Sequence, residues 1–127
     1  MKKHISTGTE WENIVGYSRA VTVGNVIEVS GTVASDGNSV VGKNDAYLQT
    51  KFILNKIESA LIEADATLND IVRTRIFVKD ISRWSEIAKA HQEVFGNIKP
   101  AATMVEVSSL ISPDYLVEIE VTAILEL

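Results

Sequence analysis

Apolar and polar residues alternate along residues 115–125, which is the period of a β-strand with one buried face. Residues 103–108 predict another strand, and residues 111–114 predict the turn that joins the two. Proline suits this turn because its φ angle is fixed and it has no N–H to donate to a sheet. One face of the last strand consists of Val117, Ile119, Val121, Ala123 and Leu125. The other face carries Glu118, Glu120 and Thr122, so this strand has an apolar side and an acidic side.

Three further strands are predicted upstream of this region. Residues 17–23 and 26–30 form a hairpin, since Gly24 and Asn25 make a two-residue turn of the kind that hairpins favour. Residues 71–79 form the third strand. Its two faces carry Val72, Thr74, Ile76 and Val78 on one side and Arg73, Arg75 and Phe77 on the other.

Helical spacing of apolar residues predicts two helices. The first runs over residues 45–64, with Asn44 as the candidate N-cap. The second begins at residue 82 or 83 and runs to residue 95, where Gly96 ends it and Pro100 prevents its continuation. The first helix buries a stripe of Tyr47, Leu54, Ile57, Leu61 and Ala64. The second presents Trp84, Ile87, Ala88, His91, Val94 and Phe95 on one side.

The elements follow the order ββαβαββ, which predicts a single α+β domain over residues 1–127. Two helices cover one face of a mixed, mostly antiparallel sheet. Residues 1–16 and 34–42 are predicted to be irregular, the latter because it is rich in Ser, Asp, Gly and Asn.

The face of the sheet without helices mixes charged and apolar side chains, which suits either a solvated surface or an interface between subunits. The charged and polar members are Glu28, Arg73, Arg75, Glu118, Glu120 and Thr122, and the apolar members are Phe77, Leu116 and Ile124.

Composition excludes several classes of function. The chain has 17 acidic and 12 basic residues and a net charge of −5, which makes nucleic acid an unlikely partner. It has no cysteine, so disulfides and thiolate chemistry are excluded. No signal peptide or stretch of roughly 20 apolar residues is found, so we expect no membrane association and a cytoplasmic protein. No metal-ligand spacing or nucleotide-binding motif is present, and we expect neither a metal nor a cofactor.

Four segments together resemble one known family. The most specific is PAATMVEVSSL followed by LVEIE near the C-terminus; the others are GYSRAV, VSG and DIVRTRIFVKD. They resemble the RidA/YjgF family, also called the endoribonuclease L-PSP family, which includes enamine and imine deaminases. The resemblance implies a chorismate-mutase-like fold and a homotrimer with small-molecule pockets in the clefts between subunits. It therefore favours the interface interpretation of the helix-free face.

The resemblance also exposes a difference at the family's substrate anchor. In the deaminases an arginine in the motif PARxxVEV holds the substrate carboxylate, because a guanidinium forms paired hydrogen bonds with it. The matching residue here is Ala102, followed by Thr103 and Met104 as expected pocket residues. Three arginines could supply a cation instead: Arg19, Arg73 and Arg75. For the last two, ion pairing with Glu118 and Glu120 across the sheet is the alternative.

Other matched positions keep the family's polar residues. Glu118 corresponds to the catalytic carboxylate, which would activate water for attack on a C=N carbon. Tyr17 corresponds to the tyrosine that lines the pocket, and Ser30 and Gly31 to the loop that borders it. Each has a structural alternative: an interface ion pair for Glu118, aromatic packing for Tyr17 and a simple strand end for Gly31.

The chain departs from the family at two further positions, the first of them in the second predicted helix. Ala88 stands where archetypal members carry an asparagine, and Met104 where they carry a cysteine. His91 lies one turn after Ala88 and could line a remodelled pocket with Trp84, or be a hydrogen-bonded core residue.

Three hypotheses of function remain open from the sequence. The first is a RidA-like trimer that hydrolyses reactive enamines, imines or a related small metabolite, with classical deaminase activity weakened by Ala102. The second is a trimer that binds a small metabolite without converting it. The third is an endoribonuclease or translation inhibitor, which the acidic charge and the lack of a histidine pair disfavour.

Overall fold

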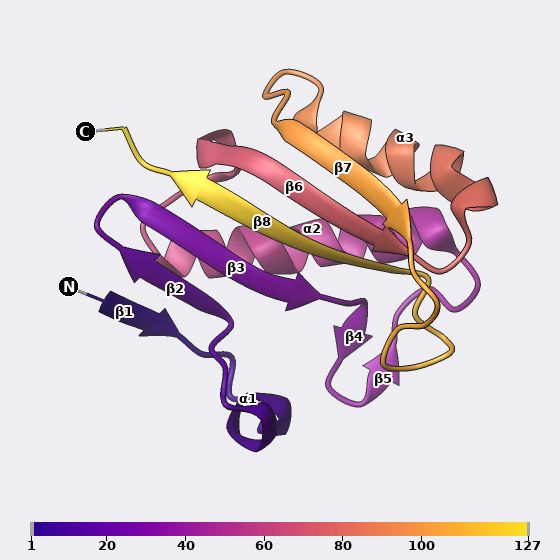
Figure 1. The fold of residues 1–127 in the computed structure, drawn as a ribbon, viewed down its shortest axis with the longest axis horizontal. Helices are drawn as coiled ribbons and strands as arrows, with labels where there is room; N and C mark the ends of the chain where they lie inside the picture. The colour runs from indigo at the N-terminus through magenta and orange to yellow at the C-terminus, as the bar shows by residue number, and fades with distance from the viewer. Residues whose placement is uncertain (1, 127) are drawn as a thin grey trace.

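A six-stranded mixed sheet forms the body of the protein, with strands in the order β1-β2-β3-β8-β6-β7 (Figure 1). The computed structural model describes residues 2–126. Only β6 and β7 pair in parallel, and the other neighbours are antiparallel. The strands are β1 Lys2–Ile5, β2 Ala20–Val23, β3 Val26–Thr32, β6 Ile71–Val78, β7 Ala101–Glu106 and β8 Val117–Ile124.

Two long helices lie on one face of this sheet (Figure 1). They are α2, Ala46–Glu63, which packs on β3 and β8, and α3, Trp84–Phe95, which packs beside α2 and connects β6 to β7. The predicted α+β class and the order ββαβαββ are therefore confirmed as the sequence β2, β3, α2, β6, α3, β7, β8. Short 3-10 turns, Leu68–Asp70 and Ile81–Arg83, precede β6 and α3.

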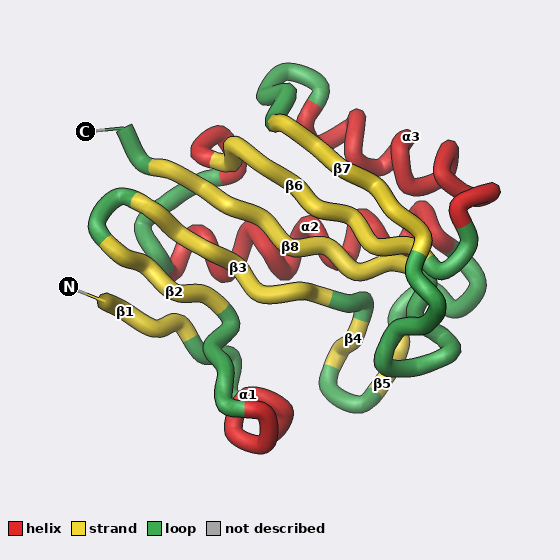
Figure 2. The backbone as a smooth tube through the Cα atoms, viewed as in Figure 1, coloured by secondary structure: helices red, strands yellow, loops and turns green. Residues whose placement is uncertain are grey.

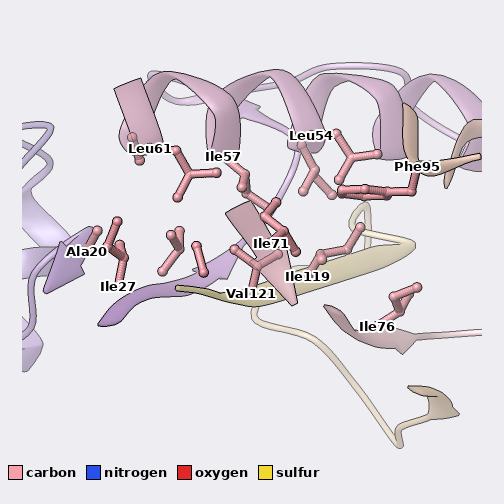
Figure 3. Close-up of a cluster of buried hydrophobic side chains, with 14 of the residues drawn as sticks. Ala20, Ile27, Leu54, Ile57, Leu61, Ile71, Ile76, Phe95, Ile119 and Val121 are labelled. Atoms are coloured by element: carbon pink, nitrogen blue, oxygen red, sulfur yellow. The ribbon is translucent and has the colours of Figure 1, made fainter. Parts of the chain in front are cut away.

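The hydrophobic core lies between the helices and the sheet (Figure 3). Ile57 and Leu61 of α2 are completely buried against Ile119 and Val121 of β8, and Phe95 closes the α3 end. Burying each of these large side chains contributes roughly 1.5–3 kcal/mol to the free energy of folding. The apolar positions of the last strand thus face the helices, and its acidic positions face away from them.

Two segments that were predicted to be irregular contain regular structure. Residues 1–16 include β1, paired with β2, and the short helix α1, Glu10–Val15. Residues 34–42 include the small hairpin β4, Ser35–Asp36, and β5, Ser39–Val40. These strands are not predicted because segments of four or two residues are too short to show a period of hydrophobicity. Pairing with a more distant strand stabilises β1, and pairing across a turn stabilises β4 and β5.

The last two strands, β7 and β8, do not pair with each other, and the predicted turn over residues 111–114 lies within the longer connection between them. β6 lies between β7 and β8, and the long connection over residues 107–116 carries the chain around it (Figure 2). Gln49 of α2 holds this connection from inside the core. Its side-chain amide donates to the Asp114 carbonyl at 2.9 Å, and its Oε1 accepts from the Leu116 N–H at 2.9 Å.

Two details of side-chain orientation also differ from prediction. Val72 is 43% exposed, because a register shift between Ile71 and Arg73 turns Ile71 inward in its place. Trp84 is 56% exposed, because it is the first residue of α3 and lies outside the stripe that contacts the core.

The N-cap of α2 is Asp45 and not Asn44. The Asp45 carboxylate accepts a hydrogen bond from the Leu48 N–H at 2.9 Å, whereas Asn44 adopts a φ of +60° and accepts from Arg83. A cap satisfies an N–H that the first turn of a helix leaves without a partner.

We expect Asp45→Ala to lower the free energy of unfolding by about 1 kcal/mol, because α2 loses this cap. Asp45→Asn is the matched control, since its amide oxygen still accepts from the Leu48 N–H. Urea denaturation of the three proteins checks the prediction, and equal stabilities for wild type and Asp45→Ala would contradict it.

Candidate functional site

Glu118 projects from β8 on the helix-free side of the sheet, directly against the backbone of Gly31 in β3. A Cβ atom built at Gly31 would overlap Oε2 of Glu118, so only glycine leaves room for the carboxyl group in this position. The close packing follows from the antiparallel pairing of β3 and β8, whose register shifts between Val29 and Thr32. Gly31 therefore allows the Glu118 side chain to pack against the backbone of β3, which is more than the role of a strand end.

The environment of Glu118 disfavours its charged form. Burial raises the pKa of the Glu118 carboxyl, the nearby Arg19 acts in the opposite direction, and Glu120 raises the pKa further. No hydrogen bond or ion pair to Glu118 is present within residues 2–126. A carboxyl group in this state can exchange a proton at a milder pH than a solvated glutamate.

A hollow of about 560 Å³ opens beside the carboxyl group. It lies on the helix-free side, and the loop after β7 forms part of its wall. The lining residues are Gly31, Phe77, Val107, Ser109, Leu110, Ile111, Glu118 and Glu120. A small molecule in this hollow would meet Glu118 directly.

Arg19 supports Gly31 from within the protein. Its side chain is 7% exposed, Nη2 donates to the Gly31 carbonyl at 2.7 Å, and Cζ lies 5.8 Å from the centroid of the Tyr17 ring. Burial lowers the pKa of the guanidinium, although Tyr17, Glu12 and Glu118 act in the opposite direction. The buried Nε has no partner in residues 2–126.

Lys56 of α2 holds the chain just beyond Gly31. Its Nζ donates to the carbonyls of Val33 at 3.4 Å and Ser35 at 3.0 Å. Burial lowers the pKa of Lys56, and repulsion by Arg19 adds to the effect. Sequence reasoning missed this residue because a lysine on a helix carries no local sign that it contacts a distant loop.

Tyr17 and Ser30 lie near Arg19 in the same corner. Ser30 Oγ donates to the Ser18 carbonyl at 2.6 Å, and the Ser30 N–H donates to the Arg19 carbonyl at 3.0 Å. The Tyr17 N–H donates to the carbonyl of Glu12 in α1 at 3.0 Å. The structure thus brings Tyr17, Arg19, Ser30, Gly31 and Glu118 into one region, the β2–β3–β8 group.

Four other predicted residues lie elsewhere, in a second hollow of about 510 Å³ between α3 and β7. Its lining residues are Ile76, Ala88, His91, Gln92, Phe95, Gly96, Lys99, Pro100, Ala102, Thr103 and Met104. We name this space the α3–β7 hollow. It shares no lining residue with the hollow at Glu118.

His91 is anchored in the wall of the α3–β7 hollow. Its Nε2 lies 3.0 Å from Thr74 Oγ1, and its ring centroid lies 4.6 Å from that of Phe95. Burial lowers the pKa of His91. His91 is therefore both a hydrogen-bonded residue and a wall of the hollow, two alternatives that the sequence had kept apart.

Arg73 and Arg75 do not form ion pairs with Glu118 or Glu120 in the part of the chain that the structure describes. Arg73 Nη2 donates to Thr103 Oγ1 at 2.8 Å, and Arg75 stands opposite Glu120 in the register of β6 and β8. On the helix-free face, these four charged side chains therefore form no ion pairs within residues 2–126.

Comparisons with known proteins identify the family. The profile described as Endoribonuclease L-PSP matches residues 7–125. The chain belongs to this family. A RutC family protein from Pyrococcus abyssi is 39% identical over 108 residues, covering 84% of each chain.

Solved structures of the family share the fold closely. Rv2704 of Mycobacterium tuberculosis, a member of the YjgF/YER057c/UK114 family, is 47% identical, with a TM-score of 0.91 over 98% of this chain and 100% of that one. YyfA of Yersinia pestis, from the conserved Rid protein family, is 34% identical, with a TM-score of 0.87 over 98% and 100%.

Within residues 2–126, no helix is both long and apolar enough to cross a membrane, and no three His, Asp or Glu side chains gather as a metal site would need.

We expect Glu118→Gln to become more stable relative to wild type as pH rises above the ordinary pKa of a glutamate. Because the folded-state pKa of Glu118 is raised, the native state binds more protons than the unfolded state in the window between the two pKa values. The wild type therefore loses stability through this window as pH rises, and glutamine removes that loss. Urea denaturation at pH values below and above the window measures the difference, and parallel curves for the two proteins would contradict it.

Proposed function

We propose that this protein is a homotrimer that binds a small metabolite in clefts between its subunits, and that Glu118 activates water there to hydrolyse an imine or enamine. The observation that carries this proposal is the Glu118 carboxyl group itself. It is half-buried, it has a raised pKa, and it faces an open hollow. Only a glycine at position 31 leaves room for it in this orientation. These are the properties of a group that exchanges protons with a bound molecule.

The helix-free face supports the trimer. Arg75 and Glu120 stand opposite each other without an ion pair, and Phe77 lies partly exposed beside them. A neighbouring copy would supply partners for these charges and cover the aromatic ring. The division of the predicted site into two groups fits the same assembly, because a cleft between subunits is where the β2–β3–β8 group of one protomer could meet the α3–β7 hollow of another.

The chemistry requires one water and one proton-transfer group. The water oxygen bonds to the carbon of the C=N group while Glu118, as the carboxylate, accepts a proton from that water. Glu118 passes this proton to the nitrogen, which gives a carbinolamine. Glu118 then accepts the proton of the carbinolamine hydroxyl group and donates it to the nitrogen as the C=O bond forms and the C–N bond breaks. The products are a carbonyl compound and ammonia, and Glu118 is again a carboxylate.

A second candidate is a trimer that binds a metabolite without converting it. The methyl group of Ala102 favours this reading, since it offers no guanidinium to orient a carboxylate near Glu118. RNA cleavage, which the name of the matching family suggests, has the weakest support here because the chain is acidic.

We expect light scattering to give a mass three times the 13.9 kDa of one chain. Phe77→Asp should shift the mass to that of a monomer, because it places a charge in the proposed interface. Trp84→Asp is the control, since Trp84 is exposed on α3, and it should remain trimeric. A monomeric wild type would rule out the clefts.

We expect Glu118→Gln to slow imine hydrolysis by about 100-fold or more, the contribution typical of a general base. An amine oxidase acting on a primary amine that lacks a carboxylate generates the imine, and its loss is followed with and without the protein. Glu28→Gln is the control, because Glu28 lies on the same face and accepts a hydrogen bond from Thr122.

Ala102→Arg separates the two candidates. Faster hydrolysis of carboxylate-bearing imines in this variant would show that only the anchor is missing. Wild-type and Ala102→Arg proteins that both leave imines to decay as in buffer would favour binding without turnover.

A further inference from the structure

The α3–β7 hollow has the size of a small-molecule site and an apolar wall. Its volume of about 510 Å³ lies within the range of ligand pockets, roughly 300–1,000 Å³. Ala88 and Phe95 come from α3, Ala102 and Met104 from β7, and Ile76 from β6. Two of these residues are alanines, so the space exists because small side chains leave it open.

His91 provides the polar group most firmly fixed in this wall. Its contacts with Thr74 and Phe95 hold the ring in place and leave Nδ1 without a hydrogen-bonding partner in residues 2–126. Because burial lowers its pKa, the imidazole is neutral at neutral pH and offers one hydrogen bond without a positive charge.

The charges around the hollow disfavour an anion. The C-terminal end of α3 lies at the hollow through Phe95 and Gly96, and the carbonyls at a helix C-terminus carry partial negative charge. Lys99 lines the hollow but is exposed, and Arg73 projects from the helix-free face of β6, opposite to Thr74 and His91. A carboxylate entering this space would lose hydration without a fixed counter-charge, which is unfavourable.

We propose that the α3–β7 hollow binds an uncharged ligand group: a compact aliphatic or aromatic body with a single hydrogen-bonding substituent that meets His91. This inference rests on the proposed function in one respect, since it names the class of metabolite that the proposed clefts take. It predicts that the substrates differ from amino-acid-derived imines, which carry a free carboxylate.

The test uses two probes of equal shape, cyclohexanecarboxamide and cyclohexanecarboxylate, titrated into the isotopically labelled protein at neutral pH. We expect the amide to shift the methyl signals of Ala88, Ala102 and Met104. It should also bind about tenfold more tightly than the carboxylate, because it has no ionic hydration shell to lose when it enters the hollow. Comparable or tighter binding of the carboxylate would overturn the proposal.

Four variants locate the binding. Ala88→Leu fills the hollow and should abolish the methyl shifts caused by the amide. Ala102→Arg should reverse the preference in favour of the carboxylate, and provides a second test should Ala88→Leu fail to fold. Lys89→Gln is the control, because Lys89 is an exposed lysine of α3 that does not line the hollow, and it should leave amide binding unchanged. Carboxylate binding that disappears in Lys99→Gln would assign the site to an anion held at the rim and overturn the proposal.

The failure of this inference is distinguishable from that of the proposed function. A trimer that hydrolyses imines through Glu118 while its hollow binds neither probe would refute only the inference. Amide binding in the hollow of a protein that is monomeric and leaves imines untouched would refute the proposed function and leave the inference standing. Contacts between the hollow and side chains of a second copy that exclude both probes would overturn the inference.

Discussion

The contact between the Glu118 carboxyl group and the backbone of Gly31 is the constraint on which the candidate site depends. It requires β3 and β8 to be neighbours, and it requires a residue without a side chain at position 31. Two buried or half-buried cations then hold the same stretch of backbone: Arg19 through the Gly31 carbonyl and Lys56 through the carbonyls of Val33 and Ser35. The backbone next to the carboxyl group is thus held by hydrogen bonds, while the carboxyl oxygens remain open to the hollow beside them.

The two faces of the sheet have different roles. One face forms the hydrophobic core, and the other carries the candidate site. Toward the helices, β8 presents side chains that are completely or almost completely buried, and these form the core with α2. Toward the other side, the same strand presents Glu118 and Glu120. Strand geometry makes this division automatic, because successive residues point to opposite faces. Gln49 adds a polar anchor within the core that secures the approach to β8 and hence the position of Glu118.

The two hollows differ in chemical character, and they therefore suit different kinds of ligand group. One contains carboxyl groups and lies by the Arg19–Gly31 corner; the other is apolar and contains a neutral imidazole. Family membership fixes the scaffold that carries both spaces. In our proposal the methyl group of Ala102 leaves the second space without a fixed counter-charge, so this space favours an uncharged group over a carboxylate.

The sequence by itself determined the fold class, the two long helices and the faces of β8, because periodicity reports which side of an element is buried. The pocket that the resemblance implies for Tyr17, Ser30, Gly31 and Glu118 stays a prediction. Only the tertiary structure decided that β6 separates β7 from β8, that Val72 faces outward, and that Asp45 caps α2. It also revealed Gln49 and Lys56, whose farthest hydrogen-bond partners, Leu116 and Val33, lie 67 and 23 residues away along the chain. Such features depend on pairings between distant segments, and a local pattern of hydrophobicity contains no information about which distant backbone group will meet a given side chain.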